Sequence, residues 1–134
     1  MEDLFINFRE KDQDELKTGC LMALGVDNSQ TRKSAAMCVA AIAKIEFPRG
    51  RWLDVIDKLA ANVNNEDKCF RLASIECLGF ICEEVSLEEV KKDSKDLIFS
   101  AIVNTIEQNI GDPTVVGIGI KALYQSMEYT RVYF

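Results

Sequence analysis

Apolar residues recur along the chain at the spacings of three and four residues that are typical of amphipathic helices. The clearest stripe starts at Trp52, with apolar residues 0, 3, 4, 7 and 11 positions along, and predicts a helix from Trp52 to Val63. Similar stripes predict a first helix that ends at Gly25, and helices over residues 32–45, 67–85, 96–110 and from Pro113 onward. The last stripe comprises Val116, Ile120, Leu123 and Met127. Alternation with a period of two is nearly absent, so the chain is predicted to be all-α.

Residues that favour helix ends support these boundaries. Asp112 precedes Pro113, which places a capping carboxylate before a proline at the first helical position. Ser86 and Glu89 have the spacing of a capping box and predict a short connecting helix. The chain is therefore predicted to contain six main helices joined by short loops.

Three short motifs recur at intervals that indicate a repeat. Apolar pairs three residues apart begin at Val39, Ile75 and Ile120, about 36 and 45 residues from one another. A period near 40 residues is typical of HEAT or armadillo repeats, in which stacked helix pairs cover each other's apolar faces. We therefore predict a right-handed α-α superhelix of about three helix pairs. It would form a single unit over residues 1–134, with repeats near 5–47, 50–92 and 93–134. Periodicity alone also leaves open a helical bundle without repeats.

Composition narrows the function classes. The chain has 134 residues, 48% of them hydrophobic, which is enough for one continuous core. No apolar block is long enough to cross a membrane, so membrane insertion is not predicted. The net charge of -6 opposes a phosphate backbone, so nucleic acid is not a predicted partner. The five cysteines lie mostly in apolar helical stretches, which favours free thiols in a reducing compartment.

Catalytic chemistry is poorly represented. The sequence has no histidine, the commonest general base and a common zinc ligand. Cys77 and Cys82 are too far apart for a zinc knuckle, and we expect both in the core. Gly117 and Gly119 lie in a helical stretch that no strand precedes, so they do not form a phosphate-binding loop. We therefore predict no catalytic, cofactor-binding or metal-binding residues, and a protein that is not an enzyme.

One predicted helix, over residues 96–110, is apolar around too wide an arc for a single buried face. At about 100° per residue, Val103 lies about 140° around the helix from Ile98. Phe99 and Val103 are one turn apart, which suits an exposed or half-exposed apolar groove that accepts an aromatic side chain. The alternative is that these residues are buried against a neighbouring repeat.

Residues 51–63, RWLDVIDKLAANV, closely resemble an early HEAT helix of the importin-β (karyopherin-β) family. The preceding segment 38–43 and the following segment 76–82 resemble adjacent helices of that family. Residues 93–98 and 122–130 continue the resemblance, which covers the chain from about Phe5 to Phe134.

The resemblance implies a nuclear transport receptor that binds other proteins during import into the nucleus. The implied partners are the Ran GTPase, importin α or direct protein cargo, and Phe-Gly nucleoporins. The implied location is the cytoplasm, the nucleus and the nuclear pore in the nuclear envelope. The chain would hold only part of the N-terminal HEAT repeats and would lack the first ones. A HEAT or armadillo scaffold of another assembly, such as a phosphatase regulatory subunit, is the alternative function.

The resemblance also implies where partners bind. In this family Phe-rich nucleoporin repeats lie between outer helices, and by register the first half of one such pocket falls on Phe99, Ser100 and Val103. The family usually has an aliphatic residue where this chain has Phe99, which alters the shape of the pocket. On the predicted inner helices, the polar residues are candidate contacts on the concave face, with ordinary solvated charge as the alternative. They are Arg32, Lys33, Glu76 and Lys121.

Overall fold

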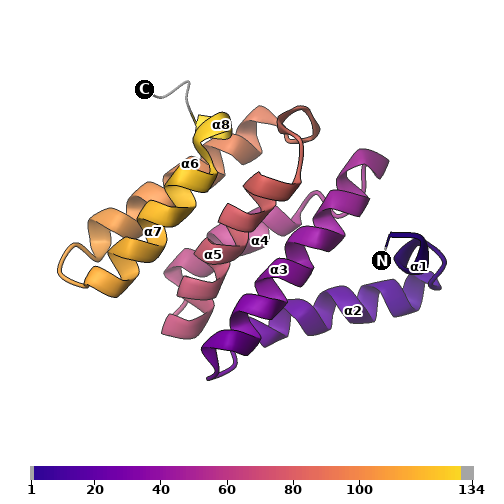
Figure 1. Ribbon diagram of the computed structural model, residues 1–134, viewed down its shortest axis with the longest axis horizontal. Coiled ribbons are helices and arrows are strands. Elements are labelled where there is room, and N and C mark those ends of the chain that lie inside the picture. Colours follow the sequence, from indigo (N-terminus) through magenta and orange to yellow (C-terminus); the bar gives the residue numbers. More distant parts are fainter. Residues whose placement is uncertain (1, 131–134) are drawn as a thin grey trace.

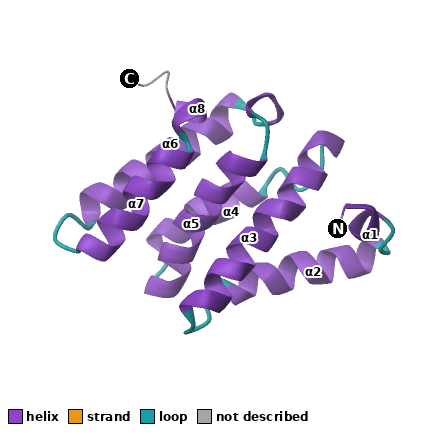
Figure 2. Ribbon diagram, in the orientation of Figure 1, coloured by secondary structure: helices purple, strands orange, loops and turns teal. Residues whose placement is uncertain are grey.

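The computed structural model describes residues 2–130, and within that range it consists of helices and loops (Figure 2). The α-helices are α1 (Glu2–Ile6), α2 (Glu10–Ala23), α3 (Ser29–Glu46), α4 (Val55–Ala61), α5 (Lys68–Glu84), α6 (Lys92–Gln108), α7 (Pro113–Gln125) and α8 (Met127–Thr130). Short 3-10 helices span Phe47–Arg49, Asn62–Asn64 and Leu87–Glu89. The all-α prediction is confirmed.

The long helices pack in antiparallel pairs, α2 with α3, α4 with α5, and α6 with α7. Helices α3, α5 and α7 lie side by side as one layer, and α4 and α6 lie behind it (Figure 1). Each pair contacts the next one along the chain, as expected for stacked helical repeats. The predicted repeat boundaries and the handedness of the superhelix stay predictions.

The core lies between the two layers and follows from the apolar stripes. Val39 of α3, Ile75 and Leu78 of α5, and Ile98 and Ile102 of α6 are all buried in one cluster. Alanines on the same face of α3 allow α5 to approach closely, because a short side chain adds little width between helix axes. They are Ala35, Ala36, Ala40 and Ala43.

Side-chain caps fix several helix starts. The carboxylate of Asp112 accepts hydrogen bonds from the backbone N–H groups of Thr114 and Val115, at 3.1 and 3.4 Å. The predicted start of α7 is therefore confirmed. Asn28 caps α3 and Asp67 caps α5 in the same way, by accepting backbone N–H groups of the first helical turn.

One predicted feature differs at a helix end. The Ser86 hydroxyl donates to the carboxylate of Glu88 and does not form the expected capping box with Glu89. Near it, the hydroxyl of the buried Tyr129 donates to the backbone carbonyl of Val85 and fastens α8 to the end of α5.

Trp52 was predicted to begin a helix, but α4 begins at Val55. Trp52 has a positive φ of 58°, a left-handed conformation that helices do not contain. Its side chain is half-buried because it packs against the cluster of Phe5, Ile42 and Ile45. The apolar side chain of Trp52 therefore serves to pack a turn and not a helix face. The prediction was wrong because Trp52 lies three residues before Val55, which is a helical spacing.

The predicted stripe of α7 is wrong at two of its four residues, since Val116 and Leu123 are half-buried and Leu123 packs against the core. The buried face of this helix carries Val115, Gly119 and Ala122, whereas Ile120 is 55% exposed. Met127, 48% exposed, belongs to α8. Small residues form the contact because a Cβ added to Gly119 would lie 2.6 Å from Cγ1 of Ile106 in α6. A stripe chosen by side-chain size therefore missed the packed face.

Candidate functional site

A cavity of about 310 Å³ opens between α5 and α7, and we call it the α5–α7 cleft. Glu76 and Phe80 of α5 line one side. Ile118 and Lys121 of α7 line the other. Helices α5 and α7, which form its walls, lie side by side in the layer of α3, α5 and α7 (Figure 1).

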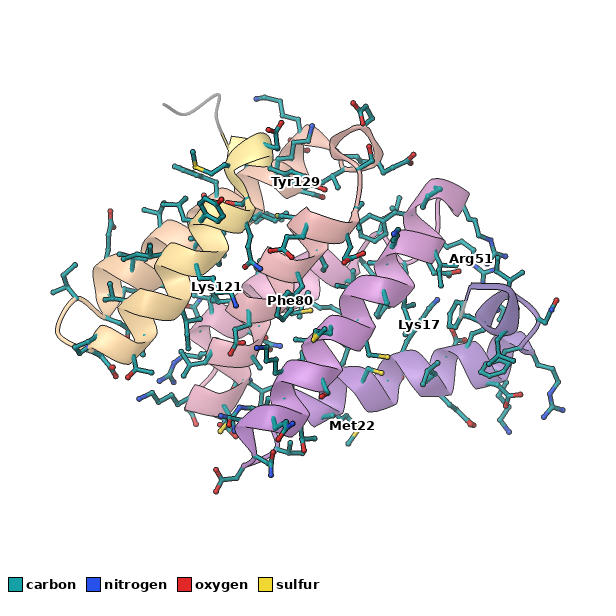
Figure 3. All side chains as sticks on the ribbon, viewed as in Figure 1. Lys17, Met22, Arg51, Phe80, Lys121 and Tyr129 are labelled. Carbon is teal, nitrogen blue, oxygen red and sulfur yellow. The ribbon has the colours of Figure 1, made fainter. Side chains whose placement is uncertain are left out.

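The cleft combines an apolar surface with charges of both signs. The Lys121 ammonium lies 5.8 Å from the centroid of the Phe80 ring, close enough for a cation–π contact (Figure 3). Glu76 is half-buried on the α5 side, and Lys121 is exposed. At one end the Gln125 side-chain amide donates to a Glu83 carboxylate oxygen at 2.6 Å. A cleft of this kind suits a peptide that offers an apolar side chain flanked by charged groups.

Helices α5 and α7 approach each other closely beneath this cleft because α5 carries Gly79. A Cβ added to Gly79 would lie 2.1 Å from the Gln125 side-chain oxygen and 3.3 Å from the Cα of Ala122. The glycine therefore sets the distance between the two walls.

The four candidate contacts of the concave face separate into two places. The structure brings Glu76 and Lys121 together in the α5–α7 cleft. Arg32 and Lys33 lie in the first turns of α3. Arg32 donates to the Val26 carbonyl at 2.8 Å and contacts the Cys69 sulfur at 3.5 Å, so it bridges the α2–α3 loop and α5. Lys33 is exposed.

The candidate groove residues Phe99, Ser100 and Val103 lie together on α6. Phe99 and Val103 are half-buried, and Ser100 is exposed. The packed face of α6 is formed by other residues, which are Ile98, Ala101, Ile102 and Thr105. Since α6 also exposes Leu97, its outer side is not enclosed by the described part of the chain.

A buried ion cluster centred on Glu46 was missed in the sequence. The Glu46 carboxylate lies 2.9 Å from the Lys17 ammonium, 3.0 Å from the Arg49 guanidinium and 3.2 Å from that of Arg51. Its side chain is 0% exposed, and that of Lys17 is 9% exposed. One signal in the sequence was the position of Glu46, which follows Val39 by seven residues and therefore shares its buried face.

Four of the five cysteines fall into two groups. Cys77 and Cys82 are buried, as predicted, and burial raises the pKa of both thiols, that of Cys82 to about 12. Cys20 of α2 and Cys38 of α3 are half-buried, and their sulfur atoms lie 3.4 Å apart. No pattern in the sequence predicts this contact, because the two residues are eighteen positions apart on different helices.

Two further properties concern residues 2–130 alone. No helix in this range is long and apolar enough to span a membrane. The same residues contain no group of three or more cysteine and acidic side chains placed to hold a metal ion.

Stacked helix pairs joined by short loops define a helical-repeat protein. No family model matches the chain. The chain is 34% identical over 121 residues to importin subunit beta-1 of Schizosaccharomyces pombe. It is 27% identical over 120 residues to that of Arabidopsis thaliana, and 27% over 121 residues to that of Saccharomyces cerevisiae.

The chain is homologous to a segment of importin subunit beta-1, and its helix pairs are HEAT repeats. The similarity covers 89–90% of the chain but only 14% of the length of each relative. The importin-β family consists of transport receptors and not of enzymes, in agreement with the prediction of a non-catalytic protein.

Proposed function

We propose that the chain is the HEAT-repeat segment of a nuclear transport receptor and contributes binding surfaces for protein partners on both of its layers. The homology to importin subunit beta-1 carries this proposal. The receptor would act in the cytoplasm, the nucleus and the nuclear pore. Because each repeat contacts only its neighbours, a small change at each interface alters the curvature, so binding at one region changes the fit at another.

On the outer side, we propose that Phe-Gly nucleoporins insert a phenylalanine ring beside Phe99, Ser100 and Val103. In support of this, the two apolar side chains are half-buried and the small Ser100 between them is exposed. The second wall would come from an outer helix that follows this segment in the full receptor. Burial of one phenylalanine ring stabilises by roughly 1.5–3 kcal/mol, which permits the rapid release that passage through a pore requires.

On the inner side, we propose that the α5–α7 cleft contacts Ran, importin α or a protein cargo. Glu76 and Lys121 would pair with charged groups of the partner, while Phe80 would pack against an apolar side chain. Lys33 would add a second, exposed contact on α3. Arg32 has protein partners already, so its contribution would be to hold the surface in shape.

The outer site is tested with Val103→Asp in the full-length receptor, measured by binding to a Phe-Gly repeat peptide. A carboxylate beside the inserted ring should weaken binding at least about tenfold, equivalent to about 1.4 kcal/mol. Ile120→Asp is the matched control, because Ile120 is exposed on α7 in the other layer. It should leave peptide binding unchanged.

Unchanged binding by the Val103→Asp receptor would favour the alternative, a HEAT scaffold such as a phosphatase regulatory subunit. The transport assignment has a separate test in which the full-length receptor is mixed with Ran loaded with GTP or GDP. A transport receptor should prefer the GTP form, and equal binding to both would contradict the assignment.

A further inference from the structure

Two thiols from different helices are in contact at the interface where α2 packs against α3. Cys20 and Cys38 lie with their sulfur atoms 3.4 Å apart, and the Cys20 thiol donates a hydrogen bond to the Cys38 sulfur. A disulfide requires a sulfur separation of about 2.05 Å, so the sulfurs need to approach by only about 1.4 Å. Because each side chain is half-buried, each is also reachable from solvent.

The two sulfurs are electronically unequal. The hydrogen bond from Cys20 stabilises the Cys38 thiolate and lowers the pKa of Cys38 to about 7. The same bond, together with burial and the neighbouring thiols of Cys38 and Cys77, raises the pKa of Cys20. The reactive form of a cysteine is the thiolate, so we expect Cys38 to react first at neutral pH. Cys20 is then placed to act as the resolving cysteine.

We propose that Cys20 and Cys38 form an oxidation site at which a hydroperoxide generates a disulfide between α2 and α3. The Cys38 thiolate attacks the peroxide O–O bond and becomes a sulfenic acid, while the leaving oxygen takes a proton and departs as water or an alcohol. The Cys20 sulfur, after losing its proton, then attacks the Cys38 sulfur and displaces hydroxide, which leaves as water. Overall, two thiols lose two protons and two electrons, and these reduce the peroxide to water and an alcohol, or to two waters when it is hydrogen peroxide.

The bond would lie within one helix pair and join residues that are eighteen positions apart. It would tie α2 to α3 and restrict their movement relative to each other. In a reducing compartment such a bond is transient and is reversed by thiol exchange, as expected of a redox-responsive site. This inference does not rest on the transport assignment.

The experiment treats the folded, reduced chain with hydrogen peroxide, blocks the remaining thiols and digests with trypsin without reduction. Trypsin cuts after Lys17, Arg32, Lys33 and Lys44, so the proposed bond joins peptide 18–32 to peptide 34–44. We expect this linked pair, and its loss on treatment with dithiothreitol. Cys69, half-buried on α5, is the internal control and should remain reduced.

Two variants separate the steps. Cys20→Ser keeps a hydrogen-bond donor but cannot form the disulfide, so the Cys38 sulfenic acid should accumulate and be trapped by dimedone. Cys20→Ala removes the donor, so oxidation of Cys38 at neutral pH should slow several-fold. The proposal is overturned if the wild-type chain gives a dimedone adduct without the linked peptides, if Cys69 enters the linkage, or if Cys20→Ala reacts as fast as wild type.

Discussion

Replacing Glu46 with glutamine tests the buried ion cluster directly. Glu46→Gln keeps the size of the side chain but removes the negative charge that faces Lys17, Arg49 and Arg51. The two arginine side chains are about one-third exposed and can recover solvation by water. Lys17, 9% exposed, cannot do so and becomes a buried ammonium with no counter-ion among the residues that the structure describes.

The expected cost follows from Lys17. Breaking a buried ion pair by removing one partner costs about 3–5 kcal/mol. The Lys17 ammonium also lies 5.9 Å from the centroid of the Phe5 ring and 5.3 Å from that of Trp52. These rings retain a favourable cation–π contact in the variant, so we expect a loss near the lower limit, about 3 kcal/mol of the free energy of unfolding.

Urea unfolding followed by circular dichroism measures this loss, and a double-mutant cycle isolates its cause. Lys17→Met removes the unpaired ammonium, so the variant Lys17→Met/Glu46→Gln should be more stable than Glu46→Gln alone by about 2 kcal/mol. Two results would refute the reasoning. One is a Glu46→Gln variant within about 0.5 kcal/mol of wild type, and the other is a double variant whose loss equals the sum of the two single losses.

Two further predictions concern α7 and its contacts. Gly79→Ala should cost about 1 kcal/mol in urea unfolding, because the new Cβ displaces the Gln125 side chain. Gly117→Ala should be neutral or stabilising, because its new Cβ would meet no atom within 4 Å beyond its chain neighbours and the backbone of its own helix. Lys68 and backbone N–H groups lower the pKa of Asp112, so its charge stabilises the fold above the ordinary pKa of an aspartate and loses this effect as the pH falls through the lowered value. Asp112→Asn should therefore show a smaller difference in urea midpoint between about pH 7 and about pH 3 than wild type, and an unchanged difference would contradict this.

The helices themselves were largely predictable from the sequence because their packed faces carry large apolar side chains. Val39, Ile75 and Ile98 each belong to a stripe of apolar residues at helical spacing within their own helix, and all three are buried as expected. Helix α7 shows the limit of this reasoning. It packs largely through Gly119 and Ala122, and a pattern of large residues therefore included the exposed Ile120.

The candidate site was predictable only in part. Glu76 and Lys121 were selected as polar residues on inner helices, and the structure brings them into one cleft with Phe80. The packing of α5 against α7 decides which polar residues share a cleft. A local sequence pattern does not predict how two separate helices pack. The same reason explains why the contact between Cys20 and Cys38 was not foreseen.

Trp52, which was wrongly predicted to begin a helix, lies in a turn beside the Glu46 cluster. A tryptophan with a φ of 58° is strained, so surrounding contacts must hold it in place. The backbone N–H of Arg51 donates to the Glu46 carbonyl at 3.0 Å, and the Trp52 ring faces the Lys17 ammonium. Trp52 is the single tryptophan of the chain, so its fluorescence reports on this turn alone. If the cluster holds the turn, the emission of Glu46→Gln should shift to the red at lower urea concentrations than the loss of helix, whereas the two transitions should coincide in wild type. Coincident transitions in the variant would mean that apolar packing against Phe5 and Ile42 holds the turn without help from the charges.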